Sequence, residues 1–240
     1  MRYQGLSPRT RIIRWGLLAV SLGVVLGATV PEATRALATT ILERPANLAW
    51  YAERLVGFLA YFALAASVLY GLLLSTKILD TLAQRAVTFA LHQDLAAVGL
   101  GLAAIHGALL GLDHTMPFSL AEIALPFAAP YRPLWVGVGQ LAFYLTFAVV
   151  ASFYLRRRIG QRAWRLLHYA TFLAFLGATA HGLAAGTDSS TPWAWWAYVG
   201  SSAAVVFLLT YRITLSLGRR VGGPVGRVVQ PVSSKATSSR

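Results

Sequence analysis

Four histidines lie in long apolar stretches of the sequence, and their side chains are the ones best suited to chemistry. They form two groups, His92 with His106 and His168 with His181, whose members are 14 and 13 residues apart. An imidazole inside a membrane is costly unless it is paired, ligates a metal or faces a bundle interior. The sequence has no cysteine, so thiolate ligation of haem and iron–sulfur clusters on this chain are excluded. The residues therefore favour a metal cofactor held by histidine.

The composition indicates that these histidines lie in a membrane protein. Hydrophobic residues make up 57% of the 240 positions and charged residues only 12%, which is too apolar for an ordinary soluble domain. We expect an all-α membrane protein with a segment 1–11, six transmembrane helices over 12–217 and a disordered basic tail over 218–240. The six apolar stretches are Ile12 to Val30, Leu55 to Ser75, Ala86 to Leu110, Leu134 to Leu155, Trp164 to Ala185, and Trp195 to Leu215.

The distribution of basic residues predicts how the helices are oriented. If the N-terminus is cytoplasmic, 17 Lys and Arg residues fall on the inner side and four on the outer side. Because Lys and Arg concentrate in cytoplasmic segments, both termini should be cytoplasmic, in a bacterial inner membrane. The first stretch follows four arginines, so cleavage as a signal peptide is an alternative for it. A nucleic-acid partner is not expected, because the basic residues flank apolar stretches and do not form one solvent-facing surface.

The order of the helices pairs the histidines by depth. The third and fifth stretches are separated by one reversed stretch and therefore run in the same direction. At 1.5 Å rise per residue, the two histidines of each stretch lie about 20 Å apart along the helix axis. His92 should be level with His168 near the cytoplasm, and His106 with His181 near the outer face. Each level then offers the two imidazoles of a six-coordinate b haem, held between helices three and five.

The unequal spacings predict an irregular fifth helix. On an ideal helix, 14 residues return to within about 40° of the starting face, whereas 13 residues miss it by roughly 140°. We expect a π-bulge or an overwound turn in the fifth stretch, or two haems rotated relative to each other. Gly99 and Gly101 lie between the histidines of the third stretch, where they either admit a haem or allow close helix packing. Phe175 and Gly177 occupy the corresponding part of the fifth stretch.

Several polar residues are candidates to contact the anionic propionates of a haem, which need cations or hydrogen-bond donors. The loop between the third and fourth stretches also predicts a short interfacial helix over Ser119 to Leu125, covering the outer site. His114 in this loop either binds ferric ion or a partner or is simply solvated. A bare metal site is disfavoured, because no HExxH pattern occurs. The candidates for the inner haem are Arg85, Arg158, Arg162, Arg165 and Gln93, and those for the outer haem are Arg132 and Tyr131.

These residues resemble the ferric reductase-like transmembrane domain family. The likeness covers about Leu55 to Arg212. It implies a six-helix bundle with two b haems, one ligated by His92 and His168 and the other by His106 and His181. The sequence departs from the NADPH oxidases and eukaryotic ferric reductases in lacking their C-terminal flavin and nicotinamide domains. The likeness is carried by the four histidines with Arg156-Arg157-Arg158-Ile159-Gly160, Trp164-Arg165-Leu166-Leu167-His168-Tyr169 and Phe175-Leu176-Gly177 leading to His181-Gly182.

The expected function is electron transfer across the membrane. A cytoplasmic flavoprotein, or another partner carrying flavin or quinone, would donate to the inner haem, and the outer haem would reduce an extracytoplasmic acceptor. Ferric chelate, oxygen or a partner reductase would serve as this acceptor. Two alternatives remain: a quinol-linked cytochrome b subunit of a respiratory complex, although no Pro-Glu-Trp-Tyr run is present, and a non-redox membrane anchor subunit.

Overall fold

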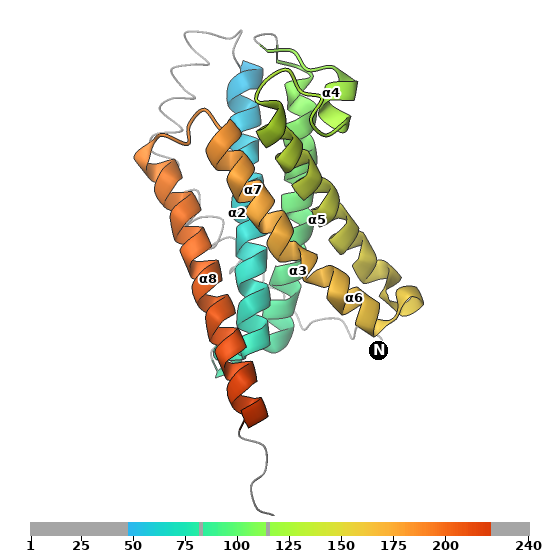
Figure 1. Cartoon of the computed structure of the whole chain (residues 1–240), viewed down its shortest axis with the longest axis vertical. Coiled ribbons are helices and arrows are strands. Elements are labelled where there is room, and N and C mark those ends of the chain that lie inside the picture. Colours follow the sequence, from blue (N-terminus) through green and yellow to red (C-terminus); the bar gives the residue numbers. More distant parts are fainter. Residues whose placement is uncertain (1–47, 82–83, 114–115, 222–240) are drawn as a thin grey trace, which may run out of the picture.

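The computed structural model describes residues 48–81, 84–113 and 116–221, and within these ranges every regular element is a helix (Figure 1). Five helical stretches are long and apolar enough to cross a membrane, which indicates a multi-pass membrane protein. The first predicted stretch, Ile12 to Val30, and the loop residue His114 lie outside the described residues. The five stretches are α2 (Leu48–Thr76), α3 (Arg85–Leu110), α5 (Pro133–Ile159), α6 and α7 together (Gln161–His168 and Ala170–Ala185), and α8 (Pro192–Val221).

These five stretches confirm the positions predicted from the sequence, and most of them extend a few residues further. The helix α8 continues to Val221, so residues 218–221 are helical and the predicted boundary of the tail at 218 is wrong. A single glycine such as Gly218 costs a helix only about 1 kcal/mol. The stronger break in the sequence comes at Gly222-Gly223-Pro224, and residues 222–240 lie outside the described part of the chain.

The helices form a bundle in which α2 and α3 pack side by side and antiparallel, while α5 packs on α7 (Figure 1). The helix α8 lies against α2. Tyr61 of α2 joins three helices, because its hydroxyl lies 3.2 Å from Thr179 Oγ1 of α7 and 2.7 Å from Ser201 Oγ of α8. Large apolar side chains such as Leu173 and Phe207 are exposed on the outside of the bundle. An apolar exterior of this kind is suited to contact with membrane lipid.

The short helix expected in the loop after α3 is confirmed as α4 (Leu120–Ala124). Ser119 caps it, since its hydroxyl accepts the Glu122 N–H while the Glu122 carboxylate accepts the Ser119 N–H. Gln140 of α5 donates from Nε2 to the carbonyls of Glu122 and Ile123, at 2.7 and 2.8 Å. The hydrogen bonds of Gln140 therefore hold α4 over one end of the bundle.

The irregularity predicted in the fifth stretch is confirmed directly after His168. The stretch is divided there into α6 and α7 by Tyr169. The Tyr169 N–H is shared between Arg165 O at 3.3 Å and Leu166 O at 3.2 Å, and the Phe172 N–H donates to Tyr169 O at 3.2 Å. Such bonds between residues three apart belong to a 3₁₀ turn, which winds more tightly than an α-helix. The overwound turn changes the direction in which His168 points relative to His181.

The turn from α5 into α6 depends on a glycine. Gly160 has φ +83° and ψ 153°, a backbone conformation that residues with a Cβ rarely adopt. Its N–H still donates to Arg156 O at 3.1 Å, which completes the last turn of α5. The Ile159-Gly160 pair of the sequence pattern therefore marks the point where the chain reverses.

Of the two glycines between the histidines of α3, Gly99 serves helix packing. A Cβ at Gly99 would lie 2.7 Å from Leu64 Cγ of α2, whereas a Cβ at Gly101 would meet nothing within 4 Å. Gly177 likewise faces Ala142 of α5, whose Cβ would lie 3.1 Å from an added Cβ. Gly99 therefore contacts α2 and does not admit a haem, whereas Gly101 faces open space and the prediction for it stays untested. The alternative, packing of small residues, holds for Gly99.

Candidate functional site: two imidazole pairs

The bundle brings the four predicted histidines together in two pairs. The ring centroids of His92 and His168 are 6.0 Å apart, and those of His106 and His181 are 6.3 Å apart. The two rings of each pair are close to perpendicular, at 78° and 72°. These distances confirm the pairing of the four histidines that was predicted from the order of the helices. One pair lies toward each end of α3.

The separation within each pair is suited to a metal ion between the rings. Two imidazoles that bind opposite sides of one ion, each at about 2 Å through a ring nitrogen, have centroids roughly 6 Å apart. Within the described ranges there is no group of three or more His, Cys, Asp or Glu side chains that could hold a metal ion. A metal ion between either pair therefore requires ligands besides these side chains, and the four nitrogens of a tetrapyrrole meet that requirement.

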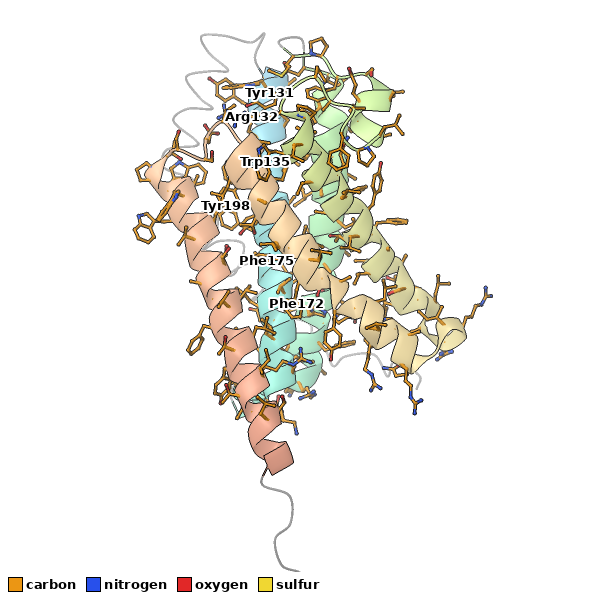
Figure 2. All side chains as sticks on the ribbon, viewed as in Figure 1. Tyr131, Arg132, Trp135, Phe172, Phe175 and Tyr198 are labelled. Atoms are coloured by element: carbon orange, nitrogen blue, oxygen red, sulfur yellow. The ribbon has the colours of Figure 1, made fainter. Side chains whose placement is uncertain are left out.

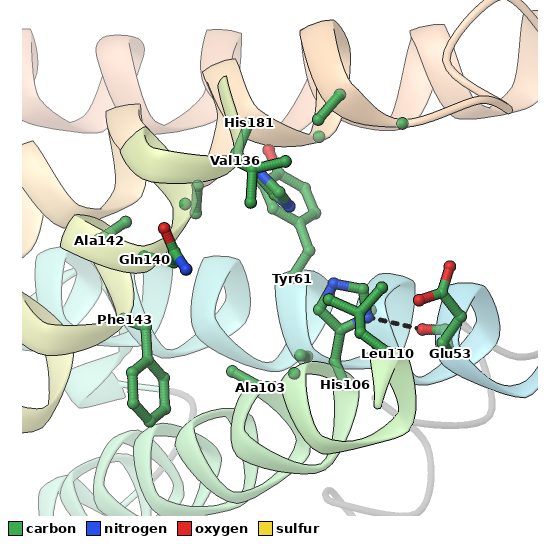
Figure 3. A pocket seen from close by; sticks show the side chains of 18 of the residues that line it. Glu53, Tyr61, Ala103, His106, Leu110, Val136, Gln140, Ala142, Phe143 and His181 are labelled. Carbon is green, nitrogen blue, oxygen red and sulfur yellow. Dashed lines mark hydrogen bonds between the residues drawn. The ribbon is translucent and has the colours of Figure 1, made fainter. Parts of the chain in front are cut away.

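Three of the four rings are oriented by hydrogen bonds to helix carbonyls. Nδ1 of His92 lies 2.8 Å from Ser67 O, and Nδ1 of His106 lies 2.8 Å from Glu53 O (Figure 3). Nδ1 of His181 lies 2.9 Å from Trp135 O. A carbonyl oxygen only accepts, so Nδ1 carries the proton and Nε2 keeps a free lone pair. This is the tautomer that binds a metal through Nε2.

A glycine follows each of these three carbonyls by four residues. Residues four apart are neighbours on one face of a helix, so a side chain there would cover the carbonyl. A Cβ at Gly57 would lie 3.0 Å from His106 Nδ1, and one at Gly71 would lie 3.1 Å from His92 Cε1. At Gly139 of α5 the distance to His181 Nδ1 would be only 2.5 Å. We call these three places, defined by Gly57, Gly71 and Gly139, the glycine notches.

The notches were not found by the sequence reasoning, although a signal for two of them is present. Gly57 and Gly71 have the same separation in sequence as His92 and His106 on the antiparallel neighbour α3. Equal spacings on two antiparallel helices place both glycines opposite both histidines. This correspondence is readable once α2 and α3 are assumed to be neighbours. For Gly139 the sequence contains no matching pair of spacings of this kind.

His168 is held differently from the other three histidines. Across the part of the chain that the structure describes, no hydrogen bond to its ring is found, and its ring stacks on Trp164 of the same helix. The two centroids are 5.2 Å apart and the planes are inclined by 27°. The helix α5 has no glycine between Gly139 and Gly160, so it offers His168 no notch. The pair of His92 and His168, predicted to be the inner one, is therefore asymmetric.

Each imidazole pair lies in a cavity. The cavity around His106 and His181 measures about 450 Å³, and the one around His92 and His168 about 340 Å³. Both volumes are in the range of cofactor pockets. Figure 3 shows the first cavity with side chains from α2, α3, α5 and α7 around it. The two cavities share a wall, formed by Tyr61, Leu64, Thr146 and Ala178.

The polar lining of the inner cavity suits an anionic group. Trp164 Nε1 is buried and finds no acceptor among the described residues. Arg165 and Gln93, both predicted, line this cavity, as does Arg212, which the sequence reasoning missed. The carboxylates of a haem would accept from these donors. An unpaired buried donor beside two cations is therefore consistent with haem at this site.

Four arginines predicted to contact propionates, Arg85, Arg132, Arg158 and Arg162, lie elsewhere. Arg85 is exposed and pairs with Asp80 at 3.3 Å, and Arg158 is exposed at the end of α5. Arg132 donates to Ala184 O, and its guanidinium lies 5.2 Å from the centre of the Tyr131 ring. Arg162 is exposed as well, and none of the four is among the described residues that line a cavity. Figure 2 shows Tyr131, Arg132 and Trp135 together at the end of the bundle that carries α4.

The outer cavity has a different polar character. Tyr131 lines it as predicted, and its one lining arginine in the described chain, Arg54, is paired with Asp188. Two buried acceptors of this cavity, Glu53 Oε2 and Gln140 Oε1, have no partner within the described residues. The imidazoles and notches of the outer cavity therefore fit a haem. Its polar lining, in contrast, provides few donors or cations for an anionic group.

The chain was compared with models of protein families, with curated proteins and with solved structures, and none of the three comparisons found a match.

The notches predict a sharp contrast between two glycine substitutions. In Gly139→Ala the new methyl group displaces the His181 ring and breaks its bond to Trp135 O, so we expect metal-cofactor affinity at the outer pair to fall about 10–100-fold. Gly101→Ala lies between histidines but faces open space, and it should bind like the native protein. Titration of the purified apoproteins with haem, followed by absorbance, measures both. Equal affinities in the two variants would contradict the role of the notch.

Proposed function

We propose that this chain carries electrons across the bacterial cytoplasmic membrane through two bis-histidine b haems. The observation that carries the proposal is the repeated imidazole pair, with centroids at 6.0 and 6.3 Å, one pair toward each end of α3. The proposal includes six membrane spans with both termini in the cytoplasm. It also includes a cytoplasmic flavin-bearing donor and an extracytoplasmic acceptor, either a ferric chelate, oxygen or a partner reductase.

The residues of the chain would hold each haem through two imidazoles. His92 and His168 would hold the inner one, and His106 and His181 the outer one. A bound haem supplies an iron that is alternately ferrous and ferric, and so it stores one electron at a time. Three of the four imidazoles are fixed by carbonyls before any cofactor binds, so little reorganisation is needed on binding.

The wall between the cavities favours transfer from one site to the other. Tyr61, Leu64, Thr146 and Ala178 line both cavities, so a single layer of side chains separates them. Tyr61 is 6% exposed and stacks on Phe175 at 6.0 Å between centroids. This layer excludes water and keeps the two sites close. The arrangement thereby supports electron transfer along the bundle from one site to the other, rather than two independent sites.

The haem content of the purified protein tests the first half of the proposal. Anaerobic reduction should give a b-type absorbance spectrum with about two haems per chain. His106→Ala and His92→Ala each remove one anchored ligand, so each variant should retain about one tightly bound haem, because the other pair is intact. Phe207→Ala, at an exposed position of α8, is the matched control and should retain two. A protein that gives no Soret band after reconstitution with haem would rule the proposal out.

Electron transfer across a bilayer tests the second half. Vesicles that contain the protein and trapped ferricyanide receive reduced flavin outside, and the loss of ferricyanide absorbance is followed. Ferricyanide should be reduced by the native protein, and the rate should fall to that of empty vesicles in His106→Ala and in His92→Ala, because both sites are needed. If either variant transfers electrons at the native rate, the two-site path is wrong.

A further inference from the structure

We propose that His168 is an exchangeable ligand, and that the inner site accepts a small neutral diatomic molecule in its place. The inference rests on the proposed function, since it concerns the ligands of the inner haem. It goes beyond that function, because a site for a diatomic ligand is not needed for electron transfer. The outer site, with two anchored rings, is not expected to share this property.

The four imidazole rings are not equally anchored by hydrogen bonds. His92, His106 and His181 each donate Nδ1–H to a carbonyl of another helix, at 2.8, 2.8 and 2.9 Å. His168 has no such bond within the described chain. Removing the hydrogen-bond partner of a metal ligand typically weakens metal binding about 10–100-fold. His168 is therefore the weakest held of the four ligands.

The helix that carries His168 is short and lies between two irregular points of the backbone. The helix α6 has eight residues, and none of them is buried. It is bounded by Gly160, with φ +83°, and by the irregular turn at Tyr169. Trp164, the stacking partner of His168, belongs to the same helix. A small displacement of α6 therefore moves the ring away from the inner cavity without breaking a hydrogen bond between the ring and another helix.

The side chains around the inner cavity would border a ligand bound in place of His168, and they are mostly apolar. Phe89, Phe153 and Phe172 line the cavity together with aliphatic side chains. A small apolar diatomic molecule is suited to such a lining, whereas an anion would lie nearer Arg165 and Arg212. Exchange breaks the bond between the ferrous iron and His168 Nε2 and forms one bond to the diatomic ligand. No electron is transferred in this step, and the imidazole leaves as a neutral group.

Carbon monoxide is the probe, because it binds ferrous haem and its binding is visible in absorbance. The native protein, shown to hold about two haems per chain, is reduced with dithionite and mixed rapidly with carbon monoxide. One haem of the two should bind it, and the observed rate should level off at high concentration, because release of His168 becomes limiting. In His168→Gly the site is already open, so the rate should rise linearly with concentration at the same stoichiometry.

The outer pair supplies the matched control. When His181→Gly is loaded with excess haem to two per chain, its outer site is open as well, so it should bind two molecules of carbon monoxide per chain. Native protein with two haems that binds no carbon monoxide would overturn the inference and leave the proposed function standing. A levelling rate that persists in His168→Gly would also overturn it, since another ligand would then be the one released. Protein that holds no haem would overturn both proposals.

Discussion

The structure depends on one interaction made three times, the hydrogen bond from an imidazole Nδ1 to a helix carbonyl across a glycine notch. A helix carbonyl normally accepts only from the N–H four residues on, and a side chain at that later residue covers it. Gly57, Gly71 and Gly139 leave the carbonyls open, so the ring can approach to 2.8 or 2.9 Å. This hydrogen bond gives the imidazole Nδ1–H an acceptor inside an apolar bundle, and it also selects the tautomer of the ring.

This interaction couples helix packing to the site. His92 and His106 can both meet notches on α2 only if the two helices are antiparallel and in one register, because the notches and the histidines are equally spaced in sequence. Gly99 supports this register, since it lets Leu64 of α2 pack closely on α3. The break between α6 and α7 at Tyr169 lies between His168 and His181, and each of these histidines faces a partner on α3, which their spacing on a straight regular helix would not allow. Packing and ligand geometry therefore stabilise each other.

The parts of this arrangement that could be predicted from the sequence follow from the length of the apolar stretches, the alternating direction of successive helices and the period of the α-helix. Apolar stretches predicted the positions of five helices, and alternation of direction paired His92 with His168 and His106 with His181. The mismatch between the spacing of His168 and His181 and the helical period indicated the irregular turn. The notches could not be found in this way, because their hydrogen-bond acceptors are backbone atoms and their glycines look like ordinary packing residues. The ion pair of Arg85 with Asp80 was not predicted either, because it depends on the turn that joins α2 and α3.

Electron paramagnetic resonance of the oxidised, haem-loaded protein tests the central claim most directly, because the signal of a low-spin haem depends on its axial ligands and on the angle between their planes. The rings are inclined by 78° in the inner pair and 72° in the outer pair. The account predicts two highly anisotropic low-spin signals of similar intensity, as nearly perpendicular imidazoles produce. A high-spin signal alone would contradict two bis-histidine haems.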